Sequence, residues 1–248
     1  MSKVLELIEL VKQSNNIVVF TGAGISTESD IPDFRSNSGL YASGKYKDYK
    51  PEQILSRKFF FTNKEIFFSF YRDRLLSLCD KQPNRSHYAL VKLEEIGKLK
   101  WVVTQNIDNL HQKAGSKNVL DLHGNGSKCH CISCYKKFTF DEFCVILNSS
   151  DIPRCDCGGI VRPSTVLFDE CLNDDVYDKA YYEIKKADLL ISIGSSLVVQ
   201  PAAGLLSEKS KECKLVIINN SDTPYDKKAD LVINENCGDV LENLIKNI

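Results

Sequence analysis

The sequence predicts an α/β fold, with a Rossmann-like parallel sheet covered by helices and a smaller zinc-binding domain inserted into it. Three observations lead to this prediction. Short buried-strand patterns alternate with helical patterns along most of the 248 residues. A glycine-rich turn, T-G-A-G, follows the first strand pattern. A cysteine-rich stretch, residues 125–161, interrupts the alternation. Strands that alternate with helices imply a mostly parallel sheet with both faces covered.

The composition is that of an ordinary globular protein, with 43% hydrophobic and 26% charged residues and a formal net charge of −1. A near-neutral charge disfavours bulk electrostatic binding, so we expect no direct nucleic-acid partner. The sequence has no apolar run of about 18 residues, and its charged N-terminus does not resemble a signal peptide. We therefore expect a cytoplasmic protein with no membrane partner, whose ten cysteines are reduced or hold a metal rather than forming disulfides.

The N-terminal elements prepare a nucleotide loop. Apolar residues at helical spacing predict a helix before residue 17, and residues 17–20 read as a buried strand. Gly22 and Gly24 then turn the chain sharply into a short helical segment. Glycines at such a turn let backbone N–H groups approach a pyrophosphate, although any tight strand-to-helix turn has a similar composition.

The next stretch, residues 30–48, is rich in polar residues and glycine and has no periodicity. A long irregular segment directly after a phosphate turn predicts a lid over a ligand. Helices are expected at 64–79 and 86–96, followed by a strand at 101–104.

Polar residues follow two neighbouring strands of the predicted sheet. The first group is Q-N-I-D-N-L-H, from Gln105 to His111, and the second is His123-Gly124 after the apolar pair Val119-Leu120. In open α/β sheets ligands bind beyond the carboxyl ends of the strands, so both groups are placed for function.

After the cysteine-rich stretch the alternation resumes. We expect strands at 164–168, 189–193, 215–219 and 231–233, and helices at 174–186, 202–211 and 238–247. Gly194-Ser195-Ser196 forms a second small-residue turn suited to a phosphate or a ribose. A dehydrogenase would have a third glycine where Thr27 stands, and its absence argues against simple hydride transfer.

Two short cysteine pairs predict a zinc site. Cys131-x-x-Cys134 and Cys155-x-Cys157 can supply four thiolates to one tetrahedral ion, and four thiolates leave no open position, so the metal would be structural. Unrelated buried cysteines are the alternative. Cys129 and His130 lie beside the first pair, but their spacing fits a four-thiolate site less well.

His123 is the candidate general base among four histidines. It ends a strand and precedes a glycine, and an imidazole with a pKa near 6.5 suits proton transfer at neutral pH. A purely structural histidine is the alternative, and this is how we interpret His87 and His111. Asn106 and Asp108 could orient a sugar or an amide, or could simply cap the loop.

Taken together and in order, the motifs GAGIS, DFR, TQNIDNLH, LHG, the cysteine pairs, GSSL and Asn219 give the chain a strong resemblance to sirtuins of the bacterial type. Sirtuins are NAD-dependent protein lysine deacylases. The resemblance extends from about residue 17 to 238. It implies a Rossmann-like domain of residues 1–35, 84–124 and 162–248. The small domain would combine an inserted helical segment, 36–83, with a zinc-binding module, 125–161.

The resemblance also implies how the site works. The acyl oxygen of an acylated lysine on a protein substrate would attack C1′ of the nicotinamide ribose, and His123 would then activate the ribose hydroxyl that accepts the acyl group. Phe34 would cover the site that nicotinamide leaves. The implied NAD contacts are Ala23, Thr27, Phe34, Arg35, Gln105, Ile107, Asp108, Ser195, Ser196, Asn219 and Cys237.

Two places bear on the substrate. The predicted substrate segment, with Val166 and Phe168, continues with Asp169 where sirtuins commonly have glycine, which affects the expected pairing with a peptide. Tyr71 and Arg74 resemble the pair with which some sirtuins bind acidic acyl groups, and an arginine fork suits a carboxylate. A solvated basic helix face is the alternative reading of Arg74.

Three functions therefore stand beside deacetylation. The first is a deacylase that prefers acidic acyl groups such as succinyl-lysine. The second is a mono-ADP-ribosyltransferase that uses the same NAD chemistry on another acceptor. The third is a binding module whose zinc knuckles grip nucleic acid, which the near-neutral charge disfavours.

Overall fold

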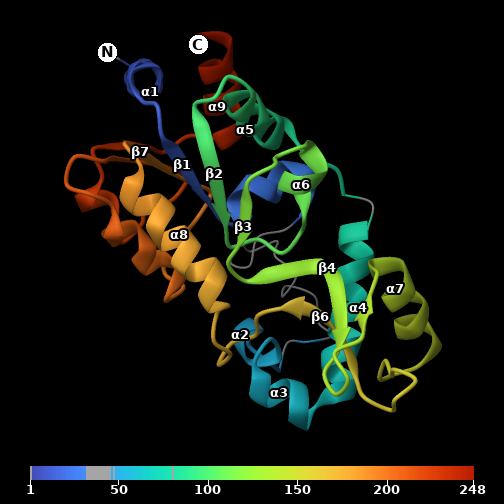
Figure 1. The fold of residues 1–248 in the computed structure, drawn as a ribbon. Coiled ribbons are helices and arrows are strands. Elements are labelled where there is room, and N and C mark those ends of the chain that lie inside the picture. The colour runs from blue at the N-terminus through green and yellow to red at the C-terminus, as the bar shows by residue number, and fades with distance from the viewer. Residues whose placement is uncertain (1, 32–45, 47, 80) are drawn as a thin grey trace.

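The computed structural model describes residues 2–31, 46, 48–79 and 81–248, apart from the side chains at 51, 74–77 and 79. Its strands form two sheets, one of six strands and one of three. Figure 1 shows the larger sheet in the upper part of the molecule and the smaller one below it. Among the described residues, no helix combines the length and the apolar character that crossing a bilayer requires.

The six-stranded sheet is parallel throughout and has the strand order β3-β2-β1-β7-β8-β9. The strand order reverses between β1 and β7, and this is the position where doubly wound sheets open a ligand-binding crevice. The strands are β1 (Ile17–Thr21), β2 (Leu99–Thr104), β3 (Val119–Asp121), β7 (Leu189–Ile193), β8 (Lys214–Ile218) and β9 (Leu231–Ile233).

Helices cover both faces of this sheet because successive strand residues point to opposite sides. Ile17 and Val19 of β1 pack in one apolar cluster with α1 (Lys3–Gln13), α5 (Arg85–Glu95) and α9 (Cys237–Lys246). Val18 and Phe20 pack in another with α8 (Asp174–Lys186) and the 3₁₀ helix η3 (Ala202–Glu208). The expectation of a parallel sheet covered on both faces is confirmed.

The three-stranded sheet is antiparallel, with the order β5-β4-β6. Its strands are β4 (Gly124–Cys131), β5 (Lys137–Phe138) and β6 (Val161–Thr165), and it packs beside α2 (Pro51–Ile54), α3 (Arg57–Thr62), α4 (Lys64–Cys79) and α7 (Phe140–Ser149) (Figure 1). A separate cluster rich in phenylalanine forms its core. The remaining short helices are η1 (Ala23–Ser29), α6 (Leu110–Ala114) and η4 (Asp226–Lys228).

Two expected elements are wrong in position or type. The strand expected at 164–168 is β6, which pairs antiparallel with β4 in the small sheet. It ends at Thr165 because the chain then enters a turn, in which the carbonyl of Leu167 accepts the N–H of Glu170. The helix expected at 202–211 is the shorter η3, in which Gly204 lowers helix propensity. Most of the expected lid, residues 30–48, lies outside the described residues.

Candidate active site at the crossing of two glycine loops

The loops that follow β1 and β7 touch through their backbones. The N–H of Gly24 donates to the carbonyl oxygen of Gly194 at 2.8 Å, and the N–H of Gly22 donates to that of Ile193 at 3.1 Å. A Cβ added to Gly24 would lie 2.7 Å from the Cα of Gly194, which itself has φ +61°. Only glycine allows this contact. The absence of side chains at these glycines lets the two loops pack backbone against backbone, and we call this contact the glycine cradle; such close approach is what a pyrophosphate-binding turn requires.

The loop after β2 is fixed to η1 by polar side chains. Ser26 Oγ donates to Asp108 Oδ2 at 2.7 Å and accepts the Asn106 side-chain amide at 3.1 Å. Asp108 Oδ1 accepts the N–H of Leu110 at 2.9 Å, so this carboxylate also caps the start of α6. These hydrogen bonds show the loop-capping role of Asn106 and Asp108, whereas their orienting a sugar or an amide stays a prediction.

Gln105 links the loop after β2 to the second glycine turn. Its side-chain amide donates to Ser195 Oγ at 2.7 Å, and its backbone N–H donates to the carbonyl of Thr21 at 3.0 Å. The Ser195 oxygen also accepts the N–H of Leu197 at 3.2 Å. Residues from three separate motifs are thus brought together at the carboxyl ends of β1, β2 and β7.

His123 lies at the same edge, and its tautomer follows from its partner. Its Nδ1 is 3.0 Å from the backbone oxygen of Gln105. A carbonyl oxygen can only accept, so Nδ1 carries the hydrogen and Nε2 keeps a lone pair. Burial lowers the pKa of His123 below its ordinary value, which keeps the ring neutral at pH 7. A neutral, half-buried imidazole with a free Nε2 lone pair is the form that a general base needs.

Asn219 and Cys237 are two further predicted NAD contacts. The Asn219 side-chain amide donates to the carbonyl of Ser221 at 2.6 Å at the end of β8. The thiol of Cys237 lies 3.6 Å from Ser86 Oγ and 3.9 Å from the carbonyl of Gly24, and burial raises its pKa. Cys237 therefore sits directly behind the glycine cradle.

The other predicted NAD contacts lie close to these loops or outside the described residues. Ala23 and Thr27 belong to η1, and the Thr27 hydroxyl donates to the carbonyl of Gly24 at 2.9 Å. The carbonyl of Ile107 accepts the N–H of Gly126 at 2.9 Å, and Ser196 follows Ser195 in the second turn. Phe34 and Arg35 lie outside the described residues.

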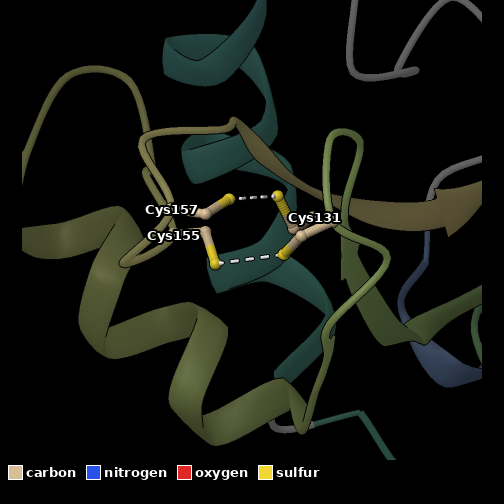
Figure 2. A group of neighbouring side chains, drawn as sticks. Cys131, Cys155 and Cys157 are labelled. Carbon is tan, nitrogen blue, oxygen red and sulfur yellow. Dashed lines mark hydrogen bonds between the residues drawn. The ribbon is translucent and has the colours of Figure 1, made fainter.

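The four predicted zinc ligands converge (Figure 2). All four sulfurs lie within 4.8 Å of one another, with Cys131 3.5 Å from Cys157 and Cys134 3.7 Å from Cys155. A tetrahedral ion with Zn–S bonds of about 2.3 Å requires sulfurs about 3.8 Å apart, so the donor set fits zinc.

Local backbone geometry supports these thiolates. Hydrogen bonds from backbone N–H groups, that of Cys134 first, lower the pKa of Cys131 to about 6. A Cβ on Gly159 would lie 2.6 Å from the Cys131 sulfur, so the second knuckle needs glycine there. As expected, neither Cys129 nor His130 belongs to this four-sulfur cluster, and the His130 ring is 2.9 Å from Ser164 Oγ instead.

The predicted substrate segment is bound through its backbone to His123, between β3 and β4, and to the turn between α2 and α3. The N–H of Val166 donates to the carbonyl of His123 at 2.8 Å, and Phe168 pairs through its backbone N–H and carbonyl with Leu55 and Arg57. Asp169 has φ +68°, in the left-handed region that favours glycine and tolerates aspartate. The aspartate thus adopts the backbone conformation for which a glycine would be suited, and the turn is kept.

The acyl-specificity residues remain predictions. The Tyr71 hydroxyl is 2.6 Å from Thr165 Oγ1, and its ring is buried in the core of the small sheet. Arg74 lies on α4, but its side chain is outside the described set.

Sequence reasoning missed two threonines, Thr21 and Thr104, which end β1 and β2. Their hydroxyls are 2.8 Å apart, and Thr21 also lies 3.0 Å from the ring of His111. The available signal was a hydroxyl residue ending each of two neighbouring strands, directly before the two polar loops.

Comparisons with known proteins agree with this geometry. A model of the Sir2 family matches residues 22–201. The chain is 50% identical to an NAD-dependent protein deacetylase of Clostridium acetobutylicum, covering 99% of each chain, and 51% identical to one of Clostridium perfringens, covering 98% of each. A Sir2 structure with a p53 peptide and NAD+ has a TM-score of 0.88 at 40% identity, covering 97% of this chain and 96% of that one. Another, bound to an acetylated peptide, has a TM-score of 0.87 at 38% identity, covering 98% and 97%.

Proposed function

The chain belongs to the Sir2 family, and on that premise we propose that it is an NAD-dependent protein lysine deacetylase of the bacterial type. It transfers the acyl group of an acyl-lysine to ADP-ribose and releases nicotinamide. The observation that carries the proposal is the placement of a neutral His123, with its Nε2 lone pair available, beside two glycine loops in backbone contact at the reversal of the sheet.

Bound NAD would supply the C1′ carbon that the acyl oxygen attacks as nicotinamide leaves, and the ribose hydroxyl that then takes the acyl group. Gly22, Gly24 and Gly194 allow the backbone to approach the pyrophosphate. His123 Nε2 takes the proton of the ribose hydroxyl, while the carbonyl of Gln105 fixes Nδ1 and thereby the ring orientation. We assign the nicotinamide side to Gln105, Ile107 and Asp108, and the ribose and adenine side to Ser195, Ser196, Asn219 and Cys237. The lid residues Phe34 and Arg35 would exclude water from the reacting centre.

The small sheet and its helices form the second lobe in this proposal. It comprises the inserted segment 36–83 and the zinc module 125–161, with β6 crossing the boundary at residue 162. The zinc ion, held by Cys131, Cys134, Cys155 and Cys157, would be structural. Val166 and Phe168 would border the acylated lysine of a protein substrate.

We also place the enzyme in the cytoplasm. The support for this is the cluster of four cysteine sulfurs, because a four-thiolate zinc site needs reducing conditions.

The test is to incubate the purified protein with NAD and one peptide carrying acetyl-, succinyl- or fatty-acyl-lysine, and to identify products by mass spectrometry. We expect NAD-dependent loss of the acetyl group with formation of acetylated ADP-ribose. Faster removal of succinyl would support the Tyr71 and Arg74 prediction. A peptide that stays acylated while a protein acceptor gains ADP-ribose would replace deacylation by ADP-ribosyl transfer.

The His123→Ala variant tests the base directly. General-base catalysis contributes about 10²- to 10⁴-fold, so acyl transfer should fall by that range while NAD binding, measured by calorimetry, stays close to that of the unmodified protein. Turnover that persists near the normal rate would refute the assignment of His123.

A further inference from the structure

A set of neighbouring buried polar groups lies beneath the active-site loops and has no role in the mechanism above. His87 and His111 are 0% and 1% exposed, and their ring centroids are 4.9 Å apart. The His111 Nε2 atom is 3.0 Å from the hydroxyl of Thr21, which donates to Thr104 Oγ1 at 2.8 Å. The Thr104 oxygen also accepts the N–H of Asn106 at 3.0 Å.

The backbone decides the direction of these hydrogen bonds. The N–H of Asn84 can only donate, and it points to Nδ1 of His87 at 3.3 Å, so that ring carries its hydrogen on Nε2. Because Thr21 donates to Thr104, its oxygen accepts from His111, which therefore carries its hydrogen on Nε2. His111 Nδ1 then has a lone pair.

Two atoms of this set, His87 Nε2 and His111 Nδ1, are among the four buried side-chain polar atoms of the described residues that have no hydrogen-bond partner. One is a donor and the other an acceptor, and the two neutral rings pack edge to face with no hydrogen bond between them. Burial lowers the pKa of both histidines, which preserves the neutral forms that this arrangement requires.

The far end of the set reaches the catalytic base. Gln105 lies between Thr104, the last residue of β2, and Asn106, whose N–H donates to Thr104 Oγ1. The Asn106 N–H that Thr104 Oγ1 accepts belongs to the same peptide unit as the Gln105 carbonyl, and the N–H of Gln105 donates to the backbone carbonyl of Thr21. Its carbonyl is the group that fixes His123 Nδ1.

We propose that His111, Thr21 and Thr104 form a one-directional line of buried hydrogen bonds, with the His87 ring packed on that of His111, whose role is to position Gln105 and, through its carbonyl, the ring of His123. These four are positioning residues, and the line rests on the proposed deacylase function. It explains why a hydroxyl ends both central strands and why two neutral histidines are buried together behind the site.

The first test measures the histidine tautomers in the unmodified protein and uses variants only to assign the signals. The chain has only four histidines, so nitrogen-15 NMR of their rings can be assigned by replacing each in turn with glutamine. At pH 7.5 we expect hydrogen on Nε2 in His87 and His111 and on Nδ1 in His123. Hydrogen on Nδ1 of His111, or on Nε2 of His123, would overturn the line.

The second test compares Thr104→Val with Thr104→Ser, since valine keeps the shape and serine keeps the oxygen. Two rates are measured, the exchange of labelled nicotinamide into NAD and the formation of acylated ADP-ribose. With valine we expect acyl transfer to fall about tenfold or more, because it needs an oriented base, while exchange stays within about threefold. Serine should restore transfer to within about threefold of the unmodified protein.

The outcomes separate this proposal from the underlying function. An unmodified protein that forms no acylated ADP-ribose would refute the deacylase function. If the unmodified protein is active but Thr104→Val lowers both rates in proportion to a lower melting temperature, the line is only structural and the proposal is wrong. The proposal is equally wrong if valine changes neither rate nor the tautomer of His123.

Discussion

Replacing His87 with glutamine should make the protein less sensitive to mild acid. His87 lies at the third position of α5, where its Nδ1 accepts the N–H of Asn84. Glutamine is a common residue at this position of a capping box and can accept the same hydrogen bond, but it does not titrate. The His87→Gln variant therefore removes one proton-binding site and keeps the cap.

The size of the effect follows from the shifted pKa. Burial lowers the pKa of His87 from 6.5 to about 4, with the Asp108 charge acting in the opposite direction. Between these values the unfolded chain binds a proton that the folded protein does not, so stability falls as the pH drops below 6.5. From pH 7.5 to pH 5, His87 alone contributes a loss of about 2 kcal/mol in the free energy of unfolding.

Other groups act in known directions. Burial also lowers the pKa of His111, so this histidine adds to the loss in the same pH range. The lowered pKa values of Glu28, Glu170 and Glu242 stabilise the fold above their unfolded values near 4.5, so their contribution is lost only at lower pH. Zinc binding is common to both proteins and cancels in the comparison.

The assay is urea unfolding followed by far-UV circular dichroism at pH 7.5, 6.5, 5.5 and 5.0. The variant can be less stable at pH 7.5 because it loses packing in the core. Its free energy of unfolding should nevertheless fall by about 2 kcal/mol less than that of the unmodified protein on going to pH 5. Equal losses in the two proteins would show that His87 titrates normally and would refute the reasoning.

Two further changes test the cradle and the zinc site. A Cβ in Gly24→Ala would meet backbone atoms of Gly194 at 2.7 and 2.8 Å, so the KM for NAD should rise about tenfold or more. In the control variant Gly204→Ala, the Cβ meets only the flexible Gln200 side chain at 3.1 Å, and the KM for NAD should be unchanged. An unaltered KM in Gly24→Ala would argue against a cofactor at this contact. Cys134→Ser should release about one zinc per chain, seen with a colorimetric chelator, and lower the melting temperature, because binding energy of a structural ion is folding energy. The control variant Cys171→Ser changes an exposed thiol outside the cluster and should change neither the zinc content nor the melting temperature. Equal zinc content in the two variants would contradict the assignment of Cys134 as a zinc ligand.

Much of the site could be predicted from the sequence because its signals are local. Each signal can be recognised within a few residues of sequence: a glycine turn after a buried strand, cysteines paired at short spacing, and a histidine before a glycine. The alternation of strand and helix patterns was enough to predict a parallel sheet covered on both faces. The irregular stretch that follows the first turn includes Phe34 and Arg35, whose role as lid residues stays a prediction.

Only the tertiary structure decided which segments meet. Strand periodicity does not say which sheet a strand joins, so β6 was assigned to the parallel sheet although it pairs with β4. The backbone contact of Gly24 with Gly194, and the line of hydrogen bonds from His111 to Thr104, join residues far apart in the chain. These contacts depend on burial and on hydrogen bonds between distant residues. Whether a histidine is neutral, or whether a position requires glycine, can therefore be decided only when the neighbouring residues are known. The sequence by itself thus determined the chemistry available to this protein, and folding determined which of those groups act on one another.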